Sequence, residues 1–223
     1  KRVLPMVEKI GAKIVEEADV ENEESLDRLF ARLKKDWGRL DFVVHAIAFS
    51  DKEELKGRYV DTSKANFQRS LTISCFSFTD IARRALPLMT EGGSLITMSY
   101  LGAERVVRNY GVMGIIKAAL ESAVRYMAYD LGPKGIRVFA VSPGPIMTRA
   151  ASGIANFNKL LEADAVKAPL GHTVVHAPQP THRYLPASVW SQYLPLKARS
   201  VAAWRATWYC IGSSAARHSA SVL

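Results

Sequence analysis

The chain has 223 residues, of which 48% are hydrophobic, and a formal net charge of +9. This size suits one α/β domain with a substantial core, and no apolar run approaches the length of about 18 residues that a membrane span needs. The positive excess lies mostly in the tail, because no acidic residue follows Asp164. No basic stretch there is interleaved with aromatic residues, so we expect no nucleic-acid partner. Cys75 and Cys210 are too far apart to form a metal motif, and we expect no metal site.

Two kinds of hydrophobic pattern alternate along residues 1–148. Stripes with a period near 3.6 residues predict helices, and short continuous apolar runs predict strands. The predicted helices are residues 1–10, 23–37, 63–89 (with or without a break) and 110–131. The predicted strands are residues 12–18, 42–48, 94–99 and 136–141. This alternation predicts an α/β fold built on a doubly wound, Rossmann-like parallel sheet.

Ligands of such sheets bind at the carboxyl ends of the strands. Four segments fall at these ends, and we expect the functional residues among them. They are Asp19 with Val20, residues 46–49, Ser99 with Tyr100, and residues 144–148.

Tyr110 and Lys117 form a candidate reactive pair at the start of the last predicted helix. Seven residues correspond to about two helical turns, so both side chains project from one face, toward the end of the preceding strand. A neutral phenol can donate a hydrogen bond or a proton to a developing oxyanion, and a nearby ammonium lowers the pKa of the phenol. The alternative is a solvent-exposed helix face on which the two side chains have no shared role.

The segments Met-Ser-Tyr-Leu-Gly-Ala-Glu-Arg and Asn-Tyr-Gly-Val-Met-Gly-Ile-Ile-Lys-Ala-Ala-Leu-Glu resemble the bacterial enoyl-acyl-carrier-protein reductases of the short-chain dehydrogenase/reductase superfamily. That family has a tyrosine, a second tyrosine about ten residues on, and then Tyr-x6-Lys. Tyr100, Tyr110 and Lys117 occupy these positions. Most of the superfamily instead uses Tyr-x3-Lys, which would need a tyrosine where this chain has Met113. The spacing therefore favours the enoyl reductases over their relatives.

The resemblance implies reduction of the C2–C3 double bond of an enoyl thioester on acyl carrier protein, with NADH as the cofactor and NADPH not excluded. Tyr110 would donate to the thioester oxygen, Lys117 would bind the nicotinamide ribose, and Tyr100 would line the acyl site; these three form the catalytic set. The cofactor-binding set is Asp19, Val20, Ala46, Ile47, Ala48, Lys117, Ile146 and Thr148. The substrate-binding set is Ala48, Phe49, Tyr100, Tyr110 and Phe157.

Several alternatives stay open at the level of sequence. Asp19 also suits a solvated turn, Tyr100 suits a core position, and His45 suits a buried core or supporting histidine better than a ligand. The chain as a whole also suits a short-chain reductase of the 3-oxoacyl type, against which Met113 argues. A fold remnant without catalytic activity is the alternative from a different class.

The resemblance divides the chain into two parts. Residues 1–171 resemble a partial Rossmann-like reductase domain, and we expect its first βα unit, with the glycine-rich turn, to be absent. Residues 172–223 have no acidic residue and weak periodicity, so we expect a divergent, irregular segment. The family also implies a cytoplasmic enzyme and a homotetramer formed by the two long helices and the last strand. We expect that assembly to be weakened here, because no counterpart of the last strand follows Thr173.

Overall fold

The computed structural model describes Pro5, Val7, Lys9, residues 11–143 and the backbone of residues 172–176. Its α-helices are α2 (Glu23–Asp36), α3 (Lys64–Leu71), α4 (Ser77–Ala85) and α5 (Gly111–Leu131). Its strands are β1 (Phe42–His45), β2 (Gly93–Met98), β3 (Ile136–Pro143) and β4 (His172–His176). Short helical turns are η1 (Tyr59–Asp61), η2 (Thr72–Phe76), η3 (Leu86–Leu88), η4 (Leu101–Ala103) and η5 (Gly132–Lys134).

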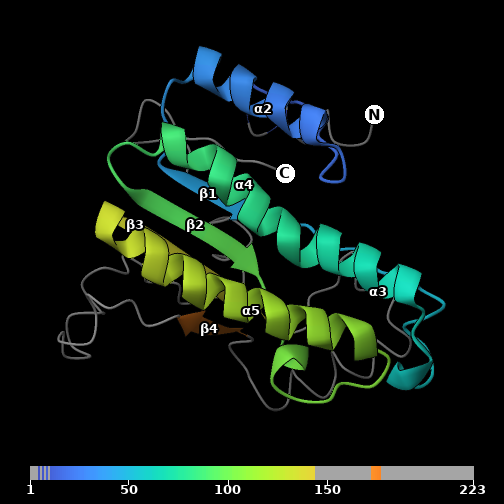
Figure 1. Cartoon of the computed structure of the whole chain (residues 1–223). Coiled ribbons are helices and arrows are strands. Elements are labelled where there is room, and N and C mark those ends of the chain that lie inside the picture. Colours follow the sequence, from blue (N-terminus) through green and yellow to red (C-terminus); the bar gives the residue numbers. More distant parts are fainter. Residues whose placement is uncertain (1–4, 6, 8, 10, 144–171, 177–223) are drawn as a thin grey trace.

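The four strands form one sheet in the order β1-β2-β3-β4. β1, β2 and β3 run parallel, and helices connect them, as the alternating pattern predicted. Figure 1 shows α4 and α5 lying side by side in front of the sheet, with α2 beside α4. The Rossmann-like α/β class is therefore confirmed, and the carboxyl ends of the parallel strands share one edge of the sheet.

The core lies between this sheet and its helices. Val43, Leu95 and Val138 are paired across β1, β2 and β3, and none of the three is exposed to solvent. Phe78 of α4 and Ile116 of α5 are equally buried above them. Burial alternates along each strand, so one face of the sheet is buried under the helices and the residues between are more exposed.

The start of α2 and the end of α5 follow from their sequences. Asn22 caps α2, because its side chain accepts a hydrogen bond from the Ser25 amide at 3.1 Å,. Two acidic residues follow in the first turn and two lysines occupy the last turn, which complements the helix dipole,. α5 ends at η5, where Pro133 prevents the α-helix from continuing,.

Two of the predictions from sequence are wrong. Residues 12–18 do not form a strand: they are irregular, and Val15 is 43% exposed. No strand of the described sheet pairs with them, so their backbone lacks the ladder that defines a strand,. Residues 172–176 were expected to be irregular but form β4, which pairs antiparallel with β3. The β-branched run at 173–175 favours this extended pairing at the sheet edge.

The helix predicted over residues 63–89 is broken in the middle by a π-helical turn, η2. Ser77, the first residue after this turn, donates its hydroxyl to the Ile73 carbonyl at 2.6 Å. The wider turn shifts the register of the helix, and Ser74 within it is completely buried. Because π-turns in α-helices frequently mark functional sites, the residues that contact η2 are candidates for the functional site.

Candidate functional site

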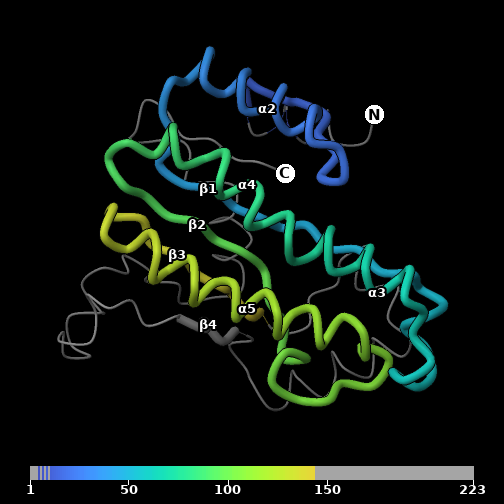
Figure 2. The backbone as a smooth tube through the Cα atoms, viewed as in Figure 1, coloured from blue at the N-terminus to red at the C-terminus, as the bar shows by residue number. Residues whose placement is uncertain are grey.

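Tyr100 and Tyr110 meet beyond the carboxyl end of β2. The chain leaves β2, passes through η4 and turns back into α5, a path that Figure 2 shows clearly. The two rings pack edge to face, with their centroids 5.0 Å apart and an angle of 71° between their planes. The sequence places these tyrosines ten residues apart, and the turn of the chain brings them into contact.

Two glycines make room for the Tyr110 ring. A Cβ atom on Gly102 would lie 2.5 Å from Cδ1 of Tyr110, which is closer than real contacts allow. A Cβ atom on Gly114 would lie 2.7 Å from the Gly102 carbonyl oxygen. η4 and the first turn of α5 therefore approach each other closely only because neither position has a side chain. The position of the phenol depends on this contact.

Lys117 lies on the buried side of α5, with 4% of its surface exposed. Its ammonium donates a hydrogen bond of 2.6 Å to the carbonyl of Met98, the last residue of β2. Burial lowers the pKa of Lys117 to about 8, while the neighbouring Cys75 and Glu121 act in the opposite direction,. Lys117 thus places a titratable positive charge at the carboxyl edge of the sheet.

The expectation that Lys117 lowers the pKa of Tyr110 is wrong. Burial raises the pKa of Tyr110 far above its ordinary value, and Tyr100 adds to that effect. Burial removes the phenol from water and so disfavours the charged phenolate. The depth of that burial cannot be read from the spacing of Tyr110 and Lys117 in the sequence. Tyr110 is therefore a neutral hydrogen-bond donor near neutral pH, which is the state that a proton donor requires.

Sequence reasoning placed Ser99 at this edge of the sheet but missed its polar partner, Glu121. Ser99 donates its hydroxyl to the carboxylate of Glu121, and both residues are buried. Glu121 lies four residues after Lys117, and therefore on the same face of α5. A glutamate among the apolar positions of a helix is the signal that could have identified it, since buried carboxylates are rare without a partner.

The segment that follows β1 lies at the same edge of the sheet. Ala46 and Ala48 are exposed, and Ile47 packs partly against the core. Phe49, which follows Ala48, forms two hydrogen bonds with Ser74 of η2. The Ser74 hydroxyl accepts from the Phe49 amide at 2.8 Å and donates to the Phe49 carbonyl at 3.1 Å. Ser74 was not predicted, although a serine within an apolar helical stripe is a recognisable signal.

Arg69 connects this segment with the part of the predicted cofactor site that contains Asp19 and Val20. Its guanidinium lies 4.6 Å from the centroid of the Phe49 ring and forms a 2.8 Å ion pair with Glu21. Asp19 is exposed and accepts a hydrogen bond from the Glu21 amide, whereas Val20 packs partly against the core. Asp19 follows an irregular segment rather than a strand, so the expectation that it lies at the carboxyl end of a strand is wrong.

Three predicted residues lie outside the described part of the chain. They are Ile146, Thr148 and Phe157. Among the other predicted residues, the structure places Tyr100 against Tyr110, and Lys117 at the end of β2. It also links Phe49 to the Asp19–Glu21 segment through Arg69.

His45 belongs to the interior, as its position in an apolar strand predicted. Its ring nitrogens lie 2.9 Å from the Thr97 hydroxyl and 2.8 Å from the Ser77 hydroxyl. Burial lowers the pKa of His45 to about 3, and the positive charge of Lys117 adds to this effect. The imidazole is neutral at physiological pH and connects β1, β2 and α4 beneath the site.

Neither a metal cluster nor a membrane helix occurs in the part of the chain that the structure describes. No group of three histidine, cysteine or acidic side chains there could hold a metal ion. None of the described helices is long and apolar enough to cross a membrane.

The parallel sheet with helical crossovers and a tyrosine–lysine pair at its carboxyl edge defines the short-chain dehydrogenase/reductase class. The family model described as enoyl-(acyl carrier protein) reductase matches residues 1–181. The chain belongs to the enoyl-(acyl carrier protein) reductase family.

Individual relatives agree with this assignment. An enoyl-acyl-carrier-protein reductase (NADH) of Rickettsia bellii is 54% identical over 170 residues, which are 76% of this chain and 65% of the relative. One from Rhizobium meliloti is 53% identical over 174 residues, which are 78% of this chain and 64% of the relative. The chain thus spans less than two thirds of the length of these curated relatives.

Solved structures of the same family have the same fold. The Anaplasma phagocytophilum reductase in complex with NAD is 55% identical, with a TM-score of 0.67 over 72% of this chain and 59% of that one. The Bacillus cereus reductase, with NADP+ and an indole naphthyridinone, is 44% identical, with a TM-score of 0.74 over 79% of this chain and 70% of that one.

Proposed function

We propose that this chain carries the site of an NADH-dependent reductase that acts on enoyl thioesters of acyl carrier protein. The observation that carries the proposal is the position of Tyr110, the N-cap residue of α5, and of Lys117 in its second turn, together with Met113, which is buried in the core. The position at which the shorter Tyr-x3-Lys spacing would need a tyrosine is thus filled by a core side chain. The names of the relatives from Rickettsia and Rhizobium support both the substrate and the cofactor.

In the proposed reaction, negative charge develops on the thioester oxygen as the C2–C3 double bond is reduced. Tyr110, which burial keeps neutral, donates a hydrogen bond to that oxygen. A donor aimed at developing charge contributes on the order of 3 kcal/mol to the lowering of the barrier. The Lys117 ammonium stabilises the same charge from the end of β2. When bound, the reduced nicotinamide supplies the hydride for C3.

The residues at the carboxyl edge of the sheet fit a nicotinamide nucleotide. Lys117 has three N–H groups, and the one that bonds Met98 leaves others for the hydroxyls of a ribose,. The exposed segment at Ala46 and Ala48 follows β1 at the edge where such folds bind nucleotides,. The exposed Asp19 carboxylate would accept a hydrogen bond from the amine of an adenine. We propose these residues, with Val20, Ile47, Ile146 and Thr148, as the cofactor site.

The substitution Tyr110→Phe tests the catalytic role. In a preparation that reduces crotonyl thioesters, it should lower kcat more than it raises KM, because the hydroxyl acts on charge that exists mainly in the transition state. Tyr126→Phe is the matched control, since Tyr126 lies on the same helix and is 73% exposed. An unchanged kcat for Tyr110→Phe would remove Tyr110 from the donor role. Reduction of acetoacetyl thioesters in preference to crotonyl thioesters would contradict the proposed substrate.

Lys117→Ala tests the cofactor site separately. It should weaken NADH affinity as well as lower kcat, because the ammonium is proposed to contact the ribose. Fluorescence titration with NADH measures this without any thioester present. Unaltered NADH affinity would count against the ribose contact while leaving the role of Tyr110 intact.

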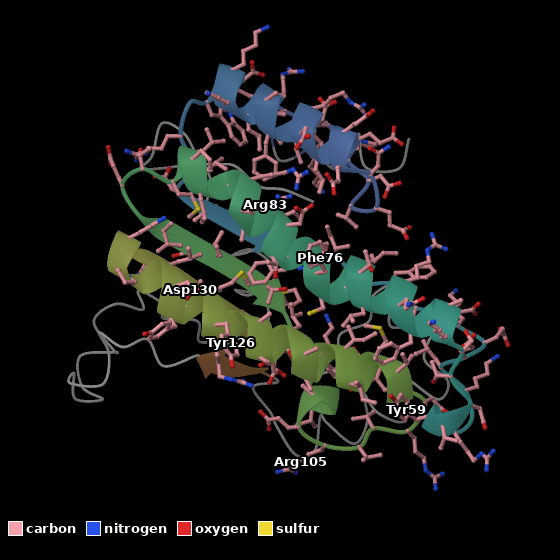
Figure 3. The ribbon with its side chains drawn as sticks, in the orientation of Figure 1. Tyr59, Phe76, Arg83, Arg105, Tyr126 and Asp130 are labelled. Carbon is pink, nitrogen blue, oxygen red and sulfur yellow. The ribbon has the colours of Figure 1, made fainter. Side chains whose placement is uncertain are left out.

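We also propose that copies of the chain associate through α4 and α5. Three aromatic side chains, Phe76 at the junction of η2 with α4 and Tyr126 and Tyr129 on α5, are exposed by 57–73%, and Figure 3 shows Phe76 and Tyr126 on the side of the molecule that faces the viewer. We expect the contact to be limited to these helices, so light scattering that shows a stable homotetramer would contradict this proposal.

We infer a cytoplasmic location as well, which suits the buried, unpaired thiol of Cys75,.

A further inference from the structure

We propose that Glu121 is a positioning residue that keeps the Lys117 ammonium charged and fixed at the carboxyl end of β2. This inference rests on the proposed function, in which the charge of Lys117 binds the cofactor ribose and stabilises the developing oxyanion. It assigns a role to a buried carboxylate that the proposed reaction does not otherwise use.

Two side-chain hydrogen bonds, one helical turn apart, join α5 to the end of β2. Lys117 donates to the carbonyl of Met98, and Glu121 accepts from the hydroxyl of Ser99. The two bonds run in opposite directions, from helix to strand and from strand to helix. The Ser99 amide is in turn held by the Val141 carbonyl of β3 at 2.7 Å. Glu121 therefore anchors α5 to a backbone segment that is already fixed in the sheet.

The charge of Glu121 is as important as its hydrogen bond. Lys117 and Glu121 have 4% and 8% of their surfaces exposed, and a buried ammonium is costly unless negative charge lies near it,. Cys75 and Glu121 are the two neighbours that act to raise the pKa of Lys117, and Cys75 can do so only as a thiolate. Burial keeps the Cys75 thiol and the Tyr110 phenol protonated by raising the pKa of each, and His45 is neutral.

Four variants separate the charge of Glu121 from its hydrogen bond. Glu121→Gln keeps the side-chain shape and an acceptor for Ser99 but removes the charge. Ser99→Ala keeps the charge and removes the hydrogen bond. Glu121→Asp keeps the charge on a shorter side chain and serves if Glu121→Gln does not fold. Glu104→Gln is the control for an equal change in charge at an exposed position near the site.

The first measurement is the titration of Lys117 by NMR on the full chain labelled with 13C-lysine, without cofactor; Lys117→Arg assigns the signal. The wild-type signal should titrate at about pH 8. Glu121→Gln should lower the midpoint by about one pH unit, and Ser99→Ala, Glu121→Asp and Glu104→Gln by less than about a third of a unit. An unchanged midpoint in Glu121→Gln, or equal shifts in Glu121→Gln and Ser99→Ala, would overturn the proposal.

The second measurement is NADH affinity at two pH values. A midpoint one unit lower reduces the protonated fraction of Lys117 about fivefold at pH 8 and hardly at all at pH 6. Glu121→Gln should therefore weaken NADH binding about fivefold at pH 8 and less than about twofold at pH 6. A loss of the same size at both pH values would indicate structural damage and overturn the proposal. If wild-type chain binds no NADH while the NMR shifts occur as expected, the proposed function fails and the role of Glu121 stands.

Discussion

His45 makes the stability of the fold depend on acid pH. The folded chain holds the pKa of this buried imidazole at about 3, whereas an imidazole in an unfolded chain has a pKa near 6.5,. Between these two values the unfolded chain binds a proton that the folded chain does not bind. Stability must therefore fall as the pH is lowered from about 6.5 toward about 3.

The size of this effect follows from the two pKa values. A difference of about 3.5 units corresponds to about 5 kcal/mol over the whole window. Between pH 7 and pH 5, where most carboxylates of folded proteins still carry their charge, the loss from His45 is about 2 kcal/mol. With a urea slope of about 2–3 kcal/mol/M, the midpoint of unfolding should fall by roughly 0.7–1 M.

His45→Gln isolates this contribution. The variant should be less stable than wild type at pH 7, because it loses the bonds to Thr97 and Ser77, but its change between pH 7 and pH 5 should be smaller by about 2 kcal/mol. Ser77→Ala is the control, since it removes a hydrogen bond without removing the titrating group and should keep the pH dependence. Urea unfolding followed by circular dichroism measures all three. Identical changes between pH 7 and pH 5 in wild type and His45→Gln would refute the reasoning.

Three further substitutions test the packing around the site. Gly102→Ala should displace the Tyr110 ring, cost about 1–3 kcal/mol of stability and lower kcat, measured by thermal unfolding and by the crotonyl assay,. Phe78→Ala should cost about 3–5 kcal/mol in urea unfolding, because Phe78 is completely buried,. Asp80→Asn should cost about 1.5–3 kcal/mol in the same experiment, because it removes the buried charge that pairs with Arg83 and Arg84, while Arg84 keeps its ion pair with Asp27,.

Each of these substitutions has a control within the chain. Gly132→Ala places a Cβ atom where no other atom lies within 4 Å and should be nearly neutral. Phe76→Ala removes a ring that is 57% exposed and should cost less than about 1 kcal/mol,. Asp61→Asn breaks an exposed ion pair and should also cost less than about 1 kcal/mol,. If a control costs as much as the substitution it matches, burial does not explain the loss.

The catalytic candidates could be predicted because they depend on local spacing. Tyr110 is the N-cap residue of the helix that contains Lys117, so their short separation in the sequence keeps both near the end of β2, and η4 is short enough to bring Tyr100 back to Tyr110. The helix predicted over residues 1–10 lies mostly outside the described residues, whereas the other helices and the three parallel strands followed for the same reason. Their patterns are continuous, and each pattern is long enough to distinguish its period.

The remaining features depend on contacts that are distant in the sequence. Residues 12–18 can form a strand only beside a partner strand, and residues 172–176 form one because they pair with the free edge of β3,. A local sequence pattern reports neither the partner strand nor the free edge. The pKa of Tyr110 depends on how deeply its ring is buried, which reverses the effect that its distance from Lys117 suggested. Ser74 and Phe49 are 25 residues apart, and their hydrogen bonds form at the π-helical turn η2, which a local pattern does not reveal.

The proposed donors have one structural origin. Residues 93–131 form a single strand–turn–helix unit, in which Lys117 and Glu121 hold α5 against the end of β2 and Gly102 lets Tyr110 pack against η4. At a rise of about 1.5 Å per residue, Tyr110 lies roughly 10 Å along the helix from Lys117. A shift of α5 along β2 would therefore move the phenol and the ammonium together. A substitution that displaces α5 from the end of β2 should alter both donors at once, whereas a change at Asp19 should alter cofactor affinity alone.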